Sequence, residues 1–117
     1  MIDLRNYKDL IRELVAKENN KDKNWRWSVK SISKNLVRIR WGYLDYLEEK
    51  ENCFLIELDS SMESMEWLHA CRPDGEIIEC YLVVEGKPNP QVGAEQTIQS
   101  GLRDAIWEIA YTAHSCY

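Results

Sequence analysis

The sequence lacks any long apolar run and any basic start followed by an apolar segment. No stretch reaches the roughly 18 to 20 apolar residues that a membrane span needs. Residues 1–5 are mixed in polarity and lead into no apolar core of a signal peptide. We therefore expect a cytoplasmic protein that does not contact a membrane.

Motifs for nucleotide binding and hydrolysis are also missing. The five glycines are scattered and form neither a phosphate-binding P-loop nor a Gly-x-Gly-x-x-Gly fingerprint. No serine occupies a Gly-x-Ser-x-Gly elbow. These absences argue against the enzyme classes that carry such motifs, so we expect no cofactor.

Paired cysteines at metal-binding or redox spacing are absent as well. The four cysteines, Cys53, Cys71, Cys80 and Cys116, include no Cys-x-x-Cys pair. A chain of 117 residues, 44% of them hydrophobic, can build a core without disulfides, and the expected compartment is reducing. We expect free thiols in one domain that covers residues 1–117.

Charge is present in quantity and is unevenly distributed. Residues 1–40 hold eleven Lys and Arg against five Asp and Glu, a balance of +6. Residues 41–117 hold four against fifteen, a balance of −11, which gives −5 for the whole chain. One explanation is a charged surface for a partner of opposite sign. The other is pairing of basic early strands with acidic later strands across a sheet.

The first half of the chain predicts a helix followed by strands. Apolar residues recur at helical spacing over residues 3–17 behind Asp3 as the N-cap, and the polar residues 18–24 predict a loop. From Trp25 onward, apolar and polar residues alternate with a period of two. This pattern predicts a hairpin over residues 25–43 with basic side chains on one face and apolar side chains on the other. Residues 48–52 predict a turn, residues 53–59 a central strand buried on both faces, and residues 60–64 a connector.

The clearest local signal is a second hairpin over residues 66–84. Pro73, Asp74 and Gly75 predict a type I turn with a glycine bulge, closed by Arg72 and Glu76. If the strands pair without interruption from this turn, Trp67 lies opposite Tyr81 and His69 lies opposite Glu79. Both pairs are then on the sheet face that the helices leave less covered. The same register places four residues beneath the helices: Leu68, Ala70, Ile78 and Cys80.

A long helix is predicted near the end of the chain, beginning around Asn89 or Ala94. Its apolar stripe contains Ile98, Leu102, Ala105, Ile106, Ile109 and Ala113. Trp107 and Tyr111 lie on the opposite side of the helical wheel and should face outward. The predicted fold is α+β, with an N-terminal helix, about five antiparallel strands, and a C-terminal helix packed with the first helix on one sheet face.

His69 supports two chemical hypotheses. Opposite Glu79 it could act as a general base, or the two could form only a structural cross-strand contact. His69 and Cys71 share a strand face and could ligate zinc, but the predicted register places Cys80 on the other face. With no nucleophile or further ligand apparent, we expect neither a catalytic residue nor a metal site.

Residues 21–43 support a nucleic-acid hypothesis. Lysine and arginine side chains, which attract phosphate, are interleaved with aromatic rings that could stack on nucleobases. This combination is typical of single-strand-binding sheets. The candidate residues are Arg26, Lys30, Arg38, Arg40 and Trp41. The alternation along the strands places the basic side chains and the aromatic rings on opposite faces, and the acidic remainder of the chain would repel phosphate. We therefore treat RNA or single-stranded nucleic acid as the alternative partner.

The surplus of aromatic residues favours a protein partner. Trp107 and Tyr111 are of the types that anchor interfaces, and they would be left outside a two-layer core. The alternative is that a long loop, such as residues 44–52, folds over them. Acidic residues that could surround such an interface are Glu48, Glu49, Glu51, Glu63, Glu66 and Glu79. An acidic surface suits a basic partner, whereas a homodimer through the last helix would bury the same aromatic pair.

In size, charge and architecture the chain resembles the immunity proteins, antitoxins and phage anti-defence inhibitors that neutralise nucleic-acid-acting enzymes. The resemblance implies a non-catalytic inhibitor of a basic protein that handles nucleic acid. The predicted partner-binding residues are Trp67, His69, Glu79, Tyr81, Trp107, Tyr111, Glu48, Glu49 and Glu51.

Overall fold

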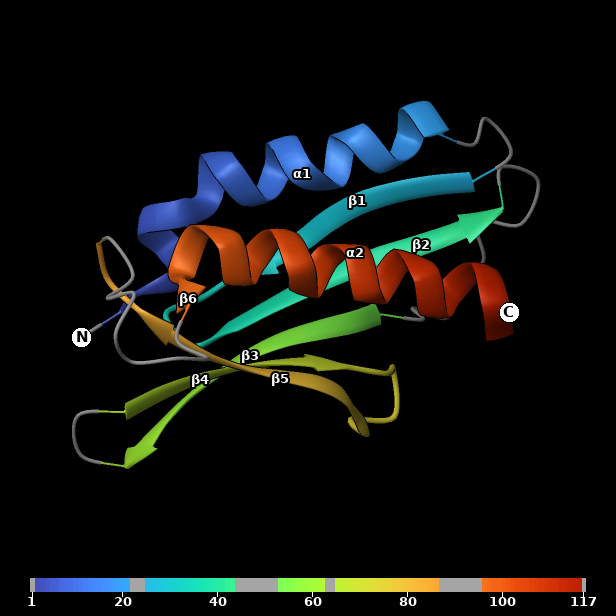
Figure 1. Ribbon diagram of the computed structural model, residues 1–117. Coiled ribbons are helices and arrows are strands. Elements are labelled where there is room, and N and C mark those ends of the chain that lie inside the picture. Colours follow the sequence, from blue (N-terminus) through green and yellow to red (C-terminus); the bar gives the residue numbers. More distant parts are fainter. Residues whose placement is uncertain (1, 22–24, 44–52, 63–64, 87–95, 117) are drawn as a thin grey trace.

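A computed structural model describes residues 2–21, 25–43, 53–62, 65–86 and 96–116 (Figure 1). A 3₁₀ turn, Leu4–Tyr7, leads into α1 (Lys8–Lys21), and the long α2 (Ile98–Cys116) comes last. Between the helices lie β1 (Trp25–Ile32), β2 (Leu36–Tyr43), β3 (Cys53–Met62), β4 (Met65–Cys71), β5 (Ile77–Val84) and β6 (Gln96–Thr97). The predicted α+β class is confirmed.

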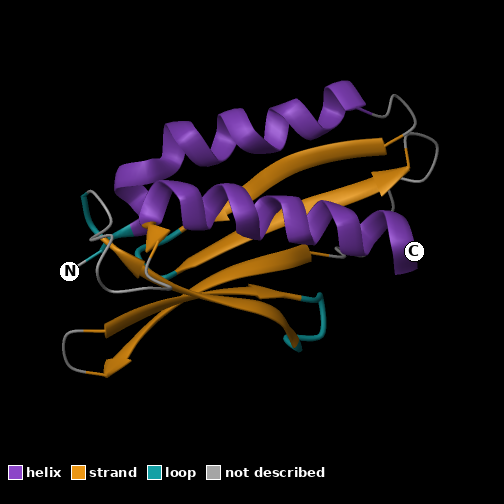
Figure 2. Cartoon of the chain, viewed as in Figure 1, coloured by secondary structure: helices purple, strands orange, loops and turns teal. Residues whose placement is uncertain are grey.

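The six strands form one sheet whose order follows the chain, β1-β2-β3-β4-β5-β6. All neighbouring pairs are antiparallel except the last, in which β6 runs parallel to the end of β5. The short β6 was not predicted. Both helices lie on the same side of the curled sheet, as Figure 2 shows, which confirms that one sheet face is covered.

α1 is longer than predicted, because tertiary contacts hold its last turn. Asp3 caps the preceding 3₁₀ turn as expected by accepting the N–H of Arg5. The predicted loop at residues 18–24 was wrong for residues 18–21. Glu18 is buried there and pairs with Lys21 at 2.8 Å. Asn19 accepts the backbone N–H of Trp27 at 2.6 Å and donates to its carbonyl at 2.8 Å, which ties the helix to the edge of β1.

The core beneath the helices is rich in aromatic rings. Trp25 stacks on Trp41 with ring centroids 4.9 Å apart, and Trp27 and Phe54 pack beside them. The predicted alternation in this hairpin is confirmed, since these rings are buried and Arg26 and Arg38 are exposed. In β3 the prediction of burial on both faces was wrong at Glu57, which is exposed, and the strand runs through residues 60–62 of the predicted connector.

The turn between β4 and β5 is confirmed. Gly75 has φ of +91° and donates its N–H to the Arg72 carbonyl at 2.9 Å, and Arg72 donates to the Glu76 carbonyl at 2.8 Å. Asp74 accepts the N–H of Glu76 at 2.9 Å. Proline, aspartate and glycine thus fix this turn by local rules, as their sequence indicated.

The predicted register of β4 and β5 was wrong beyond the first pair. Cys71 faces Ile77 as predicted, but a bulge follows, and then Ala70 pairs with Glu79, His69 with Cys80, Leu68 with Tyr81 and Trp67 with Leu82. One extra residue in a strand turns every later side chain to the other face. Glu79 and Tyr81 therefore lie on the helix side, whereas Cys80 lies with Trp67 and His69 on the open side.

The packing of α2 explains this register. The helix begins at Ile98, directly after β6, and the starts predicted at Asn89 and Ala94 lie outside the described residues. Its predicted apolar stripe is buried throughout. Gly101 lies so close to β5 that an added Cβ would stand 2.7 Å from Cγ1 of Val83. Val83 is buried beneath α2, and Tyr81 and Glu79 share its side of the strand. The close contact of Gly101 with Val83 thus fixes which β5 residues reach the helix.

Candidate protein-binding surface

Trp107 and Tyr111 form an exposed aromatic ridge on the outer side of α2. Their side chains are 54% and 58% exposed, which confirms the outward placement predicted from the helical wheel. The rings stack on each other with centroids 5.3 Å apart and planes 14° apart. Residues four apart on a helix are neighbours, so the backbone presents the two rings as one continuous apolar surface.

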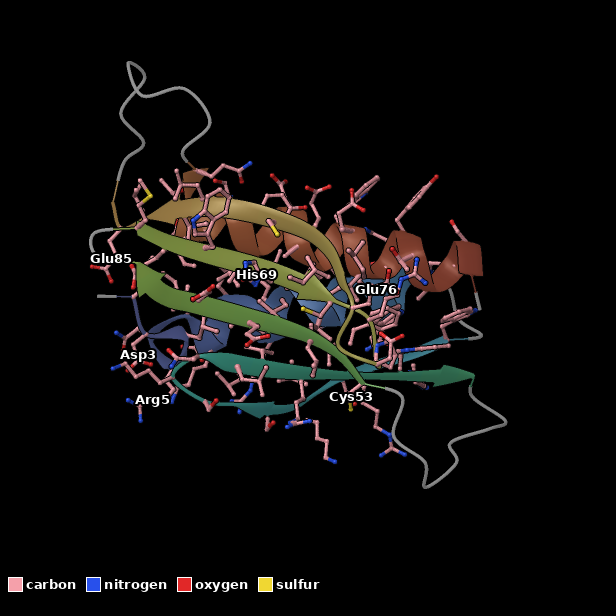
Figure 3. The ribbon with its side chains drawn as sticks, turned by 90° about the horizontal axis from the view of Figure 1, so that it is seen from below. Asp3, Arg5, Cys53, His69, Glu76 and Glu85 are labelled. Atoms are coloured by element: carbon pink, nitrogen blue, oxygen red, sulfur yellow. The ribbon has the colours of Figure 1, made fainter. Side chains whose placement is uncertain are left out.

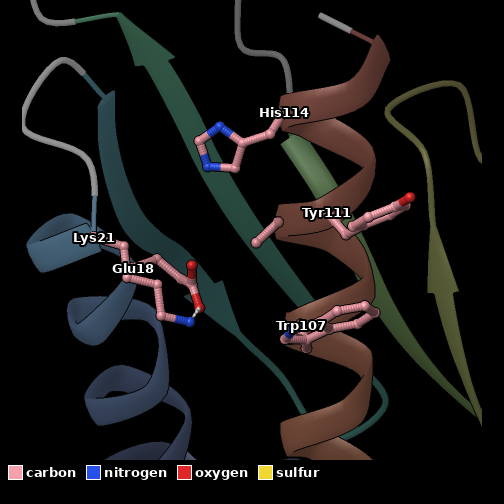
Figure 4. A pocket seen from close by; sticks show the side chains of 6 residues that line it. Glu18, Lys21, Trp107, Tyr111 and His114 are labelled. Carbon is pink, nitrogen blue, oxygen red and sulfur yellow. Dashed lines mark hydrogen bonds and ion pairs between the residues drawn. The ribbon is translucent and has the colours of Figure 1, made fainter.

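An interhelical groove runs along one side of the aromatic ridge (Figure 4). It has a volume of about 330 Å³ and is lined by Glu18, Lys21, Trp107, Ala110, Tyr111 and His114. Glu18 and Lys21 are paired with each other, and the His114 ring lies 4.4 Å from the buried Trp25. Its charged groups are thus already partnered or held against the core, and the groove carries no strong charge of one sign.

An acidic groove runs along the other side of the ridge, between α2 and β5. It has a volume of about 320 Å³ and is lined by Glu79, Tyr81, Asp104, Trp107 and Glu108. Glu79 and Tyr81 come from alternate positions of β5, and the other three residues come from one side of α2. Its lining contains three carboxyl groups and two aromatic rings but no lysine or arginine.

The negative field of this groove acts on the Tyr81 hydroxyl. Burial raises the pKa of Tyr81 well above its ordinary value of about 10, and the carboxylates of Glu108, Glu79 and Asp104 raise it further. A negative phenolate would be repelled by the same three groups. Tyr81 therefore remains a neutral hydroxyl at physiological pH, able to donate a hydrogen bond.

The structure brings together four of the predicted partner-binding residues and separates the others from them. Glu79, Tyr81, Trp107 and Tyr111 lie on the helix side of the molecule. Trp67 and His69 lie on the open sheet face, which Figure 3 views with both helices behind it. Glu48, Glu49 and Glu51 lie outside the described residues, as does Glu63.

Sequence reasoning missed Asp104 and Glu108. A signal for them was present, because both residues fall on one flank of the Trp107 and Tyr111 pair on the helical wheel. What could not be anticipated was that β5 would place Glu79 opposite that flank, since this depends on the bulge.

The open sheet face does not carry the predicted His69 and Glu79 pair. His69 lies between Glu57 on β3 and Cys80 on β5. Burial, together with Glu57 and Cys80, raises the pKa of the neighbouring Cys71 thiol to about 11. Although the observed register places His69, Cys71 and Cys80 on one face, contrary to prediction, the described residues contain no group of three or more ligands arranged to hold a metal ion.

The residues of the nucleic-acid hypothesis are divided between the two faces. Trp41 is 9% exposed within the aromatic core, where it cannot stack on a base. Arg26, Lys30 and Arg38 are exposed, and Arg40 is half-buried on the open face. In the sheet ladder Arg38 stands opposite Leu55 and Arg40 opposite Cys53. The register of β2 and β3 thus places neither arginine directly opposite an acidic residue.

No family model, curated protein or solved structure matches the chain. Among the residues that the structure describes, neither helix is both long and apolar enough to span a bilayer.

Proposed function

We propose that this chain is a non-catalytic protein-binding domain that inhibits a basic, nucleic-acid-handling protein, in the manner of immunity proteins, antitoxins and anti-defence inhibitors. The aromatic ridge and the acidic groove beside it form the binding surface. The observation that carries the proposal is the exposed stack of Trp107 and Tyr111 directly beside three carboxylates.

The aromatic ridge supplies affinity. Tryptophan and tyrosine dominate the energetics of protein interfaces because they bury a large rigid area at a small cost in side-chain entropy. An exposed pair of stacked rings held by one helix is already ordered for binding. Loss of such an anchor typically costs about 2 kcal/mol or more, which corresponds to roughly a 30-fold loss of affinity.

The acidic groove supplies the preference for a basic partner. Glu79, Asp104 and Glu108 line the groove together, so a cationic side chain placed among them would be attracted by all three carboxylates. Proteins that bind nucleic acid present lysine and arginine to phosphate. An acidic groove can occupy such a surface in place of nucleic acid.

Affinity capture followed by reconstitution tests the proposal. The wild-type chain and the Trp107→Ala/Tyr111→Ala double variant are used as bait, and a captured protein is purified and titrated by calorimetry. We expect a basic partner whose affinity falls at least 30-fold with the double variant and weakens as salt rises. Met65→Ala is the matched control, because Met65 is also a large exposed apolar residue but lies outside the grooves.

Two results would overturn the proposal. One is a homodimer in solution that the double variant dissociates, which would mean that the ridge is buried by a second copy. The other is a salt-sensitive complex with RNA or single-stranded DNA that is lost in Arg38→Glu/Arg40→Glu and kept in the double variant.

A further inference from the structure

The outer edge of β5 is unpaired along most of its length within the described part of the chain. β6 pairs only with Val83 and Val84, and no described strand lies beside residues 77–82. The backbone N–H of Cys80 donates to Oε1 of Glu79 at 3.3 Å. That N–H therefore points away from β4 and toward the edge that no described strand covers. An unpaired strand edge is a template for another extended segment.

The acidic groove lies along this edge. Side chains of a strand alternate between its two faces, and Glu79 and Tyr81 are the alternate β5 residues that face the helix side. Asp104, Trp107 and Glu108 face them from α2. An additional strand beside residues 77–82 would direct every second side chain toward the same groove.

We propose that the partner binds as an extended segment that adds a strand to the β5 edge and places arginine or lysine side chains in the acidic groove. This inference rests on the proposed function and specifies how the partner is recognised. Backbone hydrogen bonds to β5 supply affinity, and the pockets for alternate side chains supply specificity. The carboxylate of Glu79, displaced from the Cys80 N–H by the incoming backbone, becomes available to a basic side chain.

Charge identifies the occupant of the edge. Three carboxylates line the groove without a basic residue, so cationic side chains complement it. Arginine fits best, because its planar group can bind a carboxylate through two hydrogen bonds and stack on the Trp107 ring. A second copy of the chain joined through the same β5 edge would instead bring two acidic grooves together.

Synthetic peptides test the inference on the full chain. The probe is a peptide that alternates arginine with threonine, and its backbone-modified version carries N-methyl groups on alternate residues, which block pairing on one side. We expect the unmodified peptide to shift and protect the amide signals of residues 79–82 in NMR spectra. We expect the methylated peptide to bind at least tenfold more weakly. A peptide that alternates glutamate with threonine should not bind.

A pair of variants at one position tests the edge from the other side. Cys80→Pro removes the outward N–H, which an edge strand tolerates, and Cys80→Ala retains it. We expect Cys80→Pro to weaken peptide binding at least tenfold and Cys80→Ala to leave binding unchanged. Melting temperatures show whether both variants fold. If Cys80→Pro does not fold, the methylated peptide decides the matter.

The outcomes separate this inference from the function on which it rests. Equal binding of the methylated and unmodified peptides would overturn strand addition, and so would equal binding of the acidic peptide or no binding of any peptide. In each of those cases the capture experiment with the Trp107 and Tyr111 variants still decides whether the surface binds a protein.

Discussion

At the scale of single residues, the pKa of Tyr81 is shifted by burial and by neighbouring side chains that all carry negative charge. Tyr81 is half-buried among Glu79, Asp104 and Glu108, and it is the group whose pKa reports their combined field most directly. The thiols of Cys71 and Cys80 are not activated as nucleophiles. Burial raises the pKa of Cys71 and Cys80, so both remain protonated at neutral pH.

Replacing one carboxylate should change the titration of Tyr81 in a defined direction. Glu108→Gln removes the largest charge contribution, so the pKa of Tyr81 should fall toward its ordinary value while burial keeps it above about 10. NMR titration of ring-labelled tyrosine measures the shift. Glu13→Gln, a charge removal on the exposed side of α1, is the control and should leave Tyr81 unchanged. An unchanged Tyr81 in Glu108→Gln would show that the groove carboxylates do not act on it.

The same shift fixes the sign of the alkaline stability change. In the unfolded chain Tyr81 ionises near its ordinary pKa of about 10, whereas in the folded chain it keeps its proton to higher pH. Above pH 10 the folded state therefore binds more protons, and its stability falls as pH rises. Glu108→Gln should make this decline less steep.

At the scale of elements, the contact between α2 and β5 determines the shape of the acidic groove. Gly101 allows the helix to approach the sheet at Val83, which holds Trp107, Asp104 and Glu108 above Tyr81 and Glu79. A glycine within a helix lowers helix stability by about 1 kcal/mol relative to alanine. Here the close approach outweighs that loss.

Gly101→Ala should therefore destabilise the protein, although alanine favours helix. The added Cβ would meet Cγ1 of Val83, and such overpacking typically costs about 1 to 3 kcal/mol. Chemical denaturation measures the change, with Arg103→Ala on the exposed side of α2 as control. Adding Val83→Ala to Gly101→Ala should restore part of the loss that the clash causes. A Gly101→Ala variant more stable than wild type would contradict the close approach.

How much the sequence predicts differs from element to element. Periodicity predicted the outward aromatic ridge and the buried stripe of α2, because a regular helix fixes the direction of each side chain. The turn at Pro73, Asp74 and Gly75 was predictable because its chemistry is local. The acidic groove was not predictable, because it depends on a one-residue bulge in β5. Along β5, the apolar runs Ile77-Ile78 and Leu82-Val83-Val84 suit either register.

Long-range contacts also explain why the C-terminal end of α1 was predicted incorrectly. Asn19 and Asn20 are turn formers by composition, yet the helix runs through both of them to Lys21. The two hydrogen bonds between Asn19 and Trp27 join residues of different elements, and no local pattern reports them.

At the scale of the whole molecule, the charge asymmetry of the sequence becomes an asymmetry in space. Because the strand order repeats the chain order, the basic β1 and β2 lie at one side of the sheet and the acidic later segments at the other. The acidic groove belongs to the acidic side, so under the proposed function this asymmetry would attract a basic partner toward the binding surface.

Asn19 covers part of the outer edge of β1. Its amide occupies the N–H and the carbonyl of Trp27, so the β1 edge is blocked there. Asn19→Leu should cost about 1 to 3 kcal/mol for the groups left without partners. It should also allow the basic β1 edge of one copy to pair with the acidic β5 edge of another. Sedimentation velocity should then show self-association that rises with protein concentration.

Asn20→Leu is the matched control for that experiment, since it makes the same substitution at the next residue, which is exposed. It should keep the stability and the sedimentation coefficient of the wild type. An Asn19→Leu variant that stays monomeric at high concentration would show that this amide does not protect the edge.

The order of strands also has a consequence for how the molecule folds. Each strand from β2 to β5 pairs with the strand just before it, so these ladders join neighbouring segments of the chain and cost little loop-closure entropy. α2 follows every strand in the chain and returns over β4 and β5. A folding chain with only its first five strands paired would expose its apolar face and would lack the aromatic ridge. The surface that we assign to the partner thus comes into existence with the docking of the final helix.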